Sequence, residues 1–142
     1  MYSPRATSNQ LNNMQPEPNA PVRVFLVEDM PHLQGLMVEL LRSIGDFTLV
    51  GTSSTEAEAI DWLNVHRGEW DLAVVDLILE QGSGMGVLSR CRDRDRAAKV
   101  VVFSDYVTPV IHDYCISLGA DAALPRSELQ RFIDFCSSVA RR

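Results

Sequence analysis

The sequence lacks an excess of basic residues. Its 142 residues include 13 Lys and Arg against 19 Asp and Glu, which gives a formal net charge of −6. Proteins that bind nucleic acid directly, or that dock on an anionic membrane, normally present a basic face. The charge balance therefore argues against nucleic acid and against a membrane surface as partners.

Long apolar runs are missing as well, and cysteine is scarce. No run approaches the roughly 20 residues that span a bilayer, and the N-terminus shows no apolar secretory core. The three cysteines, Cys91, Cys115 and Cys136, have no CxxC spacing. Neither a disulfide framework nor a zinc site is therefore expected. We expect a cytoplasmic protein whose reduced thiols fill space in the core.

The first 21 residues differ from the rest in composition. They contain Pro4, Pro16, Pro18 and Pro21, several Asn and Gln, and few large apolar groups. Such a segment buries too little surface to offset the entropy that ordering it would cost. We expect a flexible tail over residues 1–21 and one folded domain over residues 22–142, a length that fits a single core.

Apolar strands and amphipathic helices alternate along the domain. The expected strands are Val22–Val27, Phe47–Thr52, Leu72–Asp76, Lys99–Ser104 and Ala122–Leu124. The expected helices begin near Pro31, Thr55, Gly84, Thr108 and Ser127. Thr55 and Glu58 form a capping-box pattern, and Ser127 is the expected cap of the last helix. Helical spacing assigns Leu36 and Leu129 to the apolar sides of the first and last helices.

This strict alternation predicts the fold class. Short parallel strands need right-handed crossovers, so the helices must cover both faces of one sheet. We predict an α/β, doubly wound, five-stranded parallel sheet with five helices, a flavodoxin-like three-layer sandwich. Its expected strand order is 2-1-3-4-5, the common order for five strands.

Polar residues stand where the expected strands end. Glu28 and Asp29 follow the first strand, Asp76 ends the third, Ser104 ends the fourth, and Arg126 follows the fifth. Carboxyl ends of parallel strands share one sheet edge, where ligands bind. Three converging carboxylates repel one another unless a cation lies among them, and oxygen ligands suit Mg²⁺ or Mn²⁺. We predict that Asp76 is a nucleophile that becomes an aspartyl phosphate, with Ser104 and Arg126 on the phosphoryl oxygens.

This arrangement resembles the receiver domain of two-component response regulators. The matching stretches are Val24–Asp29, Asp71–Leu77, Ser83–Gly84, Val100–Ser104 and Gly119–Ala122. The resemblance implies that Asp76 is the phosphoacceptor, that Glu28 and Asp29 are the acidic metal-binding pair, and that Ser104 follows the phosphoryl group with its hydroxyl. It further implies that the backbone carbonyl of Ile78 completes the protein's metal ligands.

Three positions depart from the family pattern. Arg126 stands where the family has a lysine, Ala123 where it has an aromatic switch residue, and Asp105 where it has a small residue. Arginine keeps the charge but carries it on a planar fork. Tyr106, just beyond Ser104, is a candidate shield of the phosphoryl group and a candidate replacement for the missing aromatic. An ordinary surface tyrosine is an equal alternative.

We therefore expect a stand-alone receiver that takes a phosphoryl group from a histidine kinase or histidine phosphotransfer protein and contacts a downstream target protein. The resemblance implies a possible homodimer through the fourth helix, fifth strand and fifth helix. No enzymatic activity beyond self-catalysed phosphorylation and dephosphorylation is expected. The alternative is a pseudo-receiver, a constitutive interaction module. A haloacid-dehalogenase-like phosphatase would need an Asp in place of Ile78, and a flavin binder would need a Ser/Thr-rich loop in place of Glu28 and Asp29.

Overall fold

The computed structural model describes residues 20–141, so the expected tail lies outside the described residues except for its last two positions. The strands are β1 (Val22–Val27), β2 (Phe47–Ser53), β3 (Leu72–Val75), β4 (Lys99–Ser104) and β5 (Ala122–Pro125). The helices are α2 (Pro31–Ile44), α3 (Glu56–Val65), α4 (Gly84–Cys91), α5 (Pro109–Ser117) and α6 (Leu129–Ala140). The predicted alternation of strands and helices is confirmed.

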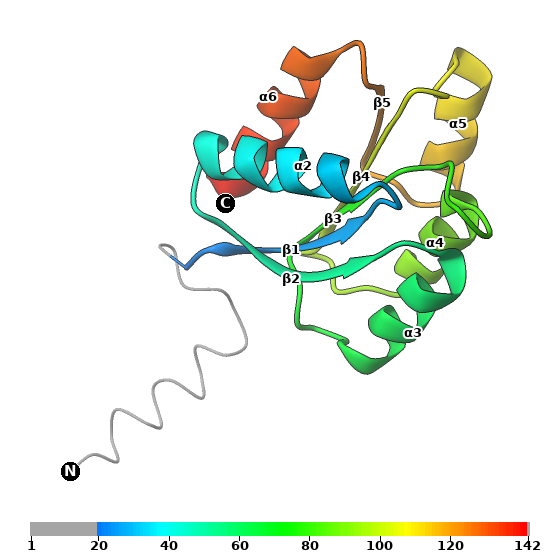
Figure 1. Ribbon diagram of the computed structural model, residues 1–142, viewed down its shortest axis with the longest axis horizontal. Helices are drawn as coiled ribbons and strands as arrows, with labels where there is room; N and C mark the ends of the chain where they lie inside the picture. The colour runs from blue at the N-terminus through cyan, green and yellow to red at the C-terminus, as the bar shows by residue number, and fades with distance from the viewer. Residues whose placement is uncertain (1–19, 142) are drawn as a thin grey trace.

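All five strands are parallel and lie in the order β2-β1-β3-β4-β5. Figure 1 shows α2 and α6 on one face of the sheet and α3 and α4 on the other. This is the predicted doubly wound, three-layer sandwich. Because the order reverses beside β1, the carboxyl ends of β1 and β3 are neighbours at one edge of the sheet.

The central strands are apolar on both sides because helices cover both faces. All four residues of β3 are buried. Ala73 and Val75 pack in the cluster that includes α3 and α4, whereas Leu72 and Val74 pack with α2 and α6. The unbroken apolar run therefore places the end of β3, and Asp76 after it, inside the molecule rather than on an exposed edge strand.

Side chains cap the N-termini of α3, α4 and α5. The Thr55 hydroxyl accepts the Glu58 N–H at 3.2 Å, as the capping-box pattern predicts. The reciprocal bond shifts by one residue, because the Glu58 carboxylate accepts the N–H of Ser54 rather than that of Thr55. Ser83 and Thr108 cap α4 and α5 in the same way. These caps fix where the loops at the carboxyl edge of the sheet end.

Three details of the helices were predicted wrongly. Ser127 does not cap α6: a turn closed by the Glu128 N–H on the Pro125 carbonyl makes Glu128 the cap residue, without a side-chain bond. That turn rotates the start of the helix, so Leu129 is 45% exposed instead of facing the core. Leu36 is 55% exposed as well, because Met37 and Leu41 fill the buried stripe of α2.

The amino ends of the strands are tied together by Arg94. Its guanidinium donates to the carbonyls of Cys91, Ala98 and Gly119, each at 2.9 Å, and to the Asp121 carboxylate at 2.9 Å. The same Asp121 oxygen accepts the N–H of Val100 at 2.8 Å. This network joins the ends of α4 and α5 to the start of β4, at the end of the sheet opposite the polar residues.

Candidate functional site

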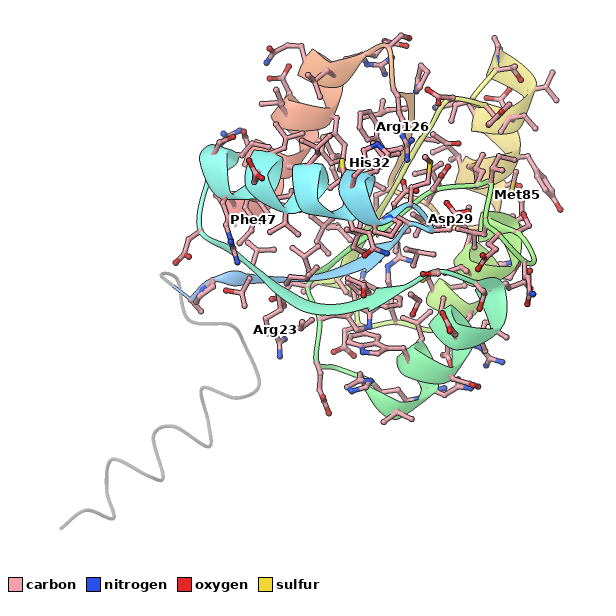
Figure 2. All side chains as sticks on the ribbon, in the orientation of Figure 1. Arg23, Asp29, His32, Phe47, Met85 and Arg126 are labelled. Atoms are coloured by element: carbon pink, nitrogen blue, oxygen red, sulfur yellow. The ribbon has the colours of Figure 1, made fainter. Side chains whose placement is uncertain are left out.

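Three acidic side chains converge at the carboxyl edge of the sheet. Glu28, Asp29 and Asp76 each offer a carboxylate oxygen, and these oxygens lie within 4.8 Å of one another. The sheet ladder places them, because the Glu28 N–H donates to Ser53 and the Asp76 N–H donates to Val27, both at 3.0 Å. The predicted convergence of the three acids is therefore confirmed. Figure 2 shows Asp29 at the end of β1, on the same side of the molecule as Arg126.

Glu28 is the most deeply buried acid of the cluster, with 1% of its surface exposed. One of its carboxylate oxygens accepts the Met30 N–H at 3.2 Å, and the other accepts a hydrogen bond from Arg126. Desolvation raises the pKa of the Glu28 carboxyl above its ordinary value, opposed by the Met30 hydrogen bond and by the charge of Arg126. Arg126 therefore compensates a buried negative charge.

Arg126 lies over the acidic cluster. Its backbone N–H donates to the Ser104 carbonyl at 3.2 Å, which extends the pairing of β4 with β5. Its Nη2 bonds Glu28 and lies 3.4 Å from Asp76 Oδ2. Its guanidinium carbon lies 6.0 Å from the centre of the Phe103 ring, within the range of a cation–π contact. The sequence placed Arg126 at this edge but did not predict its pairing with Glu28.

The remaining predicted residues follow β3 and β4 at the same edge of the sheet. The Ser104 side chain is fully buried, and its hydroxyl accepts the Tyr106 N–H at 3.4 Å. The Ile78 N–H donates to Asp76 Oδ1 at 3.3 Å. The side chains of Ile78 and Tyr106 are 52% and 59% exposed at the rim. Asp105 is exposed too, so its charge does not enter the buried cluster.

The loop after Asp76 depends on glycine and on a residue that sequence reasoning missed. A Cβ at Gly84 would lie 2.2 Å from the Asp76 carbonyl oxygen, so α4 begins against the end of β3 only because this residue is glycine. The missed residue is Glu56, whose carboxylate accepts the Ser83 N–H at 2.8 Å. Gly82 and Gly86, which leave room for this carboxylate, were its signal in the sequence.

The donor set of the cluster fits a divalent cation. Three carboxylates and one arginine leave a formal charge of about −2, which a divalent cation neutralises. Carboxylate and carbonyl oxygens are the ligands that Mg²⁺ prefers in proteins.

A model of the response regulator receiver domain family matches residues 24–133. This chain belongs to that family. The matched range includes the acidic cluster and the five strands, apart from the first two residues of β1, and two-component signalling is the context in which the family acts. The predicted resemblance is confirmed.

Curated relatives of this receiver are longer proteins. It is 26% identical over 102 residues to protein-glutamate methylesterase/protein-glutamine glutaminase 1 of Methanospirillum hungatei, covering 70% of this chain and 29% of the relative. It is 27% identical over 84 residues to the nitrate/nitrite response regulator protein NarL of Escherichia coli, covering 59% of this chain and 38% of the relative. The chain thus spans less than two fifths of the length of these relatives.

Solved structures confirm the fold. A LuxR-family DNA-binding response regulator from Staphylococcus aureus aligns with a TM-score of 0.71 and 18% identity, over 84% of this chain and 98% of that one. The CheX–CheY–BeF3–Mg complex from Borrelia burgdorferi aligns with a TM-score of 0.69 and 22% identity, over 81% of this chain and 89% of that one. At such low identity these matches establish the fold alone.

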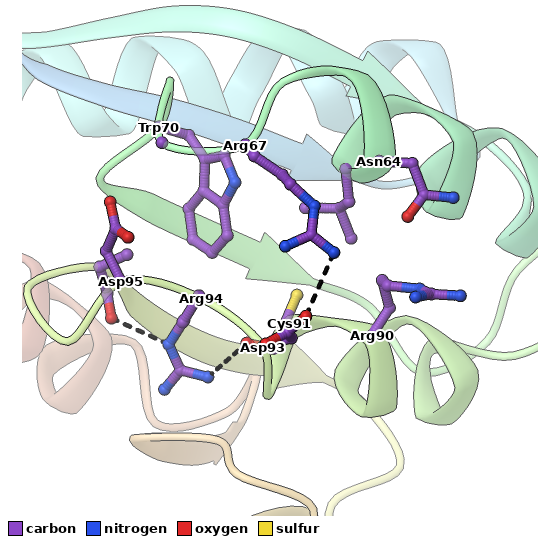
Figure 3. A pocket seen from close by; sticks show the side chains of 11 residues that line it. Asn64, Arg67, Trp70, Arg90, Cys91, Asp93, Arg94 and Asp95 are labelled. Atoms are coloured by element: carbon purple, nitrogen blue, oxygen red, sulfur yellow. Dashed lines mark hydrogen bonds and ion pairs between the residues drawn. The ribbon is translucent and has the colours of Figure 1, made fainter.

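A small cavity of about 70 Å³ lies far from the acidic cluster. Figure 3 shows Trp70, Cys91 and Arg94 in its lining, with an ion pair between Arg67 and Asp93 at 3.1 Å. Residues before β3 and β4 line it, so it opens at the amino ends of the strands, beside the Arg94 network.

Among the described residues, no helix has the length and apolar character needed to cross a membrane.

Proposed function

We propose that this receiver accepts a phosphoryl group on Asp76 in a Mg²⁺-dependent phosphorelay and passes the signal on through protein–protein contacts. The observation that carries the proposal is the position of Asp76: 8% exposed, at the end of a buried central strand, with two further carboxylates within 4.8 Å. A structural cap needs one acid, whereas this edge combines three acids, a hydroxyl and a cation.

The chemistry assigns a role to each group. A carboxylate oxygen of Asp76 attacks the phosphorus of a phosphohistidine, the P–O bond forms, the P–N bond breaks, and the imidazole leaves with its electron pair. One Asp76 oxygen is held by the Ile78 N–H and the other faces Arg126, which orients the carboxylate. The Ser104 hydroxyl, buried at the end of β4 next to the strand that leads to Asp76, would donate to one phosphoryl oxygen.

Mg²⁺ would be held by Glu28, Asp29, Asp76 and the carbonyl of Ile78, and it would neutralise charge on the transferring phosphoryl group. Arg126 Nη2 lies 3.4 Å from Asp76 Oδ2, so its charge is within reach of the oxygens that would join Asp76. To bind a phosphoryl oxygen, the guanidinium must give up part of its contact with Glu28, and a cation at the acidic cluster would replace that contact.

The proposal includes the donor and the output. A histidine kinase or histidine phosphotransfer protein would supply the phosphoryl group in the cytoplasm, and a downstream protein would bind the face formed by α5, β5 and α6. Val110 and Tyr114 on α5 are 76% and 52% exposed, which suits such a contact or a homodimer. Stand-alone action without enzymatic output is part of the proposal, and the mass of the native protein in cell extract tests it.

Intact-mass spectrometry tests the central step. The protein is incubated with acetyl phosphate and Mg²⁺, and one phosphoryl adduct is expected. Asp76→Asn and excess chelator should each abolish the adduct. Asp105→Asn is the matched control, because it removes an exposed carboxylate near the site and should leave the adduct unchanged. An adduct that survives in Asp76→Asn would refute the assignment of the phosphoacceptor.

One observation favours the alternative, a constitutive pseudo-receiver. Arg126 already pairs with Glu28 and approaches Asp76, so the cluster is partly neutralised without a metal. On this alternative, neither acetyl phosphate nor a cognate histidine kinase yields an adduct, and Asp76→Asn leaves partner binding intact.

A further inference from the structure

Glu56, the first residue of α3, connects that helix to the loop between β3 and α4. Its carboxylate Oε1 accepts the N–H of Ser83 at 2.8 Å. Its own N–H donates to the carbonyl of Gln81 at 3.1 Å. Two hydrogen bonds therefore join the start of α3 to a loop that lies more than 20 residues further along the chain, and neither belongs to the phosphoryl chemistry.

Two glycines make room for this carboxylate. A Cβ at Gly82 would lie 2.4 Å from Glu56 Cβ, and a Cβ at Gly86 would lie 2.0 Å from Glu56 Oε2. Gly82 has a positive φ of 81°, so its turn favours glycine independently. Gly86 has no such reason, since it lies inside α4, where glycine weakens a helix relative to alanine. The Glu56 carboxylate accounts for Gly86.

Ser83 links this contact to Asp76. Ser83 forms an isolated antiparallel bridge with Ile78, and its hydroxyl caps α4 by accepting the Met85 N–H at 3.0 Å. Ile78 in turn donates its N–H to Asp76 Oδ1 at 3.3 Å. Glu56 therefore holds the residue that pairs with Ile78, and Ile78 orients the phosphoacceptor.

We propose that Glu56 is a positioning residue for the metal and phosphoryl site. It fixes the loop after β3 through Ser83, and so fixes the Ile78 backbone whose carbonyl would bind Mg²⁺. The inference rests on the proposed function, because it concerns how that same site is assembled. Groups that orient metal ligands without touching the metal commonly change affinity by about 10–100-fold when they are removed.

The test is a double-mutant cycle of Glu56→Ala, Gly86→Ala and the double variant, with Glu56→Gln as the conservative variant. Glu56→Ala removes the acceptor, and Gly86→Ala displaces the carboxylate while leaving Glu56 in place. Mg²⁺ affinity is measured by isothermal titration calorimetry, and amide hydrogen exchange is measured at Ile78 and Ser83. Thermal unfolding without metal provides the third readout.

We expect Glu56→Ala to weaken Mg²⁺ binding about tenfold and to speed exchange at Ser83 and Ile78. Glu56→Gln keeps an accepting oxygen and should bind Mg²⁺ nearly as wild type does. Gly86→Ala should lower the Tm and weaken Mg²⁺ binding in the wild-type background. In the Glu56→Ala background the same substitution should raise the Tm, because alanine then improves the helix without a clash.

Each other outcome decides against the inference. If Glu56→Ala lowers the Tm but leaves Mg²⁺ affinity unchanged, Glu56 is merely structural. If Gly86→Ala raises the Tm in both backgrounds, the carboxylate does not occupy that space. If the wild-type protein binds no Mg²⁺ and forms no adduct, the proposed function fails, and the positioning role of Glu56 fails as well. That failure is distinguishable, because the reversal of the Gly86→Ala effect on the Tm would persist.

Discussion

Replacing Arg126 should leave the buried carboxylate of Glu28 without its cationic partner. In Arg126→Met the methionine keeps an apolar stem over Phe103 but removes the hydrogen bond to Glu28, whose side chain is 2% exposed. Breaking a buried ion pair from one side costs about 3–5 kcal/mol, because the remaining charge is desolvated and unpaired. Arg126 itself is 22% exposed and Glu28 keeps the Met30 N–H, so we expect the lower end, about 3 kcal/mol of unfolding free energy at neutral pH.

The control is Arg131→Met on α6. Arg131 bonds Glu128 at 2.7 Å, but the two side chains are 62% and 40% exposed. Exposed pairs of this kind contribute roughly 0–1 kcal/mol. Both variants remove one arginine from a carboxylate, and they differ in the burial of the carboxylate left behind. Urea denaturation in the presence of chelator gives both free energies of unfolding.

The loss of unfolding free energy in Arg126→Met should depend on pH. Desolvation raises the pKa of folded Glu28, so the folded state binds this proton more tightly than the unfolded chain does. The associated stability is complete below the ordinary carboxyl pKa and is lost as pH rises through the folded pKa. Without Arg126 the pKa of Glu28 in the folded state rises further. The loss of unfolding free energy in Arg126→Met should therefore be large at about pH 7 and smaller at about pH 5. Equal losses at both pH values, or a loss no larger than that of Arg131→Met, would refute the reasoning.

Three further predictions concern other parts of the molecule. Arg94→Ala removes four hydrogen bonds, including the one to Asp121, and should lower the free energy of unfolding by about 2 kcal/mol in urea denaturation without affecting phosphorylation. Burial raises the pKa of Cys91 and Cys136 to about 12, so these thiols should resist a disulfide reagent at about pH 8 in the native protein and react in urea. Tyr106→Ala should speed loss of the phosphoryl group, measured by intact mass over time; an unchanged rate would leave Tyr106 without a shielding role.

The fold could be predicted because its signals are local. Runs such as Leu72–Val75 are apolar without interruption, and that pattern indicates a strand covered on both faces. Once the strands are parallel, the handedness of the crossovers limits the order of the sheet, and the meeting of Glu28, Asp29 and Asp76 follows from that order. Backbone topology alone brings these carboxylates together.

The misplaced details depend on turn geometry and on contacts between distant residues. Leu129 has the spacing of a core residue, but the turn before α6 rotates it outward. The partner of Arg126 is Glu28, 98 positions away, and the choice between Glu28 and a phosphoryl oxygen is one of side-chain conformation. The role of Glu56 could not be predicted from the sequence, because it depends on the position of its carboxylate. That carboxylate occupies the space that a Cβ at Gly86 would need, and the sequence shows only a glycine there.

The electrostatics of the edge suit a divalent cation. Carboxylates within 4.8 Å of one another repel strongly, and burial of Glu28 adds a desolvation cost. Arg126 offsets one charge, while the N–H groups of Met30 and Ile78 bond Glu28 and Asp76. These contacts offset part of the repulsion, but they leave about two negative charges uncompensated. A divalent cation would remove that remainder. It would also weaken the contact of Glu28 with Arg126, whose Nη2 lies 3.4 Å from Asp76 Oδ2.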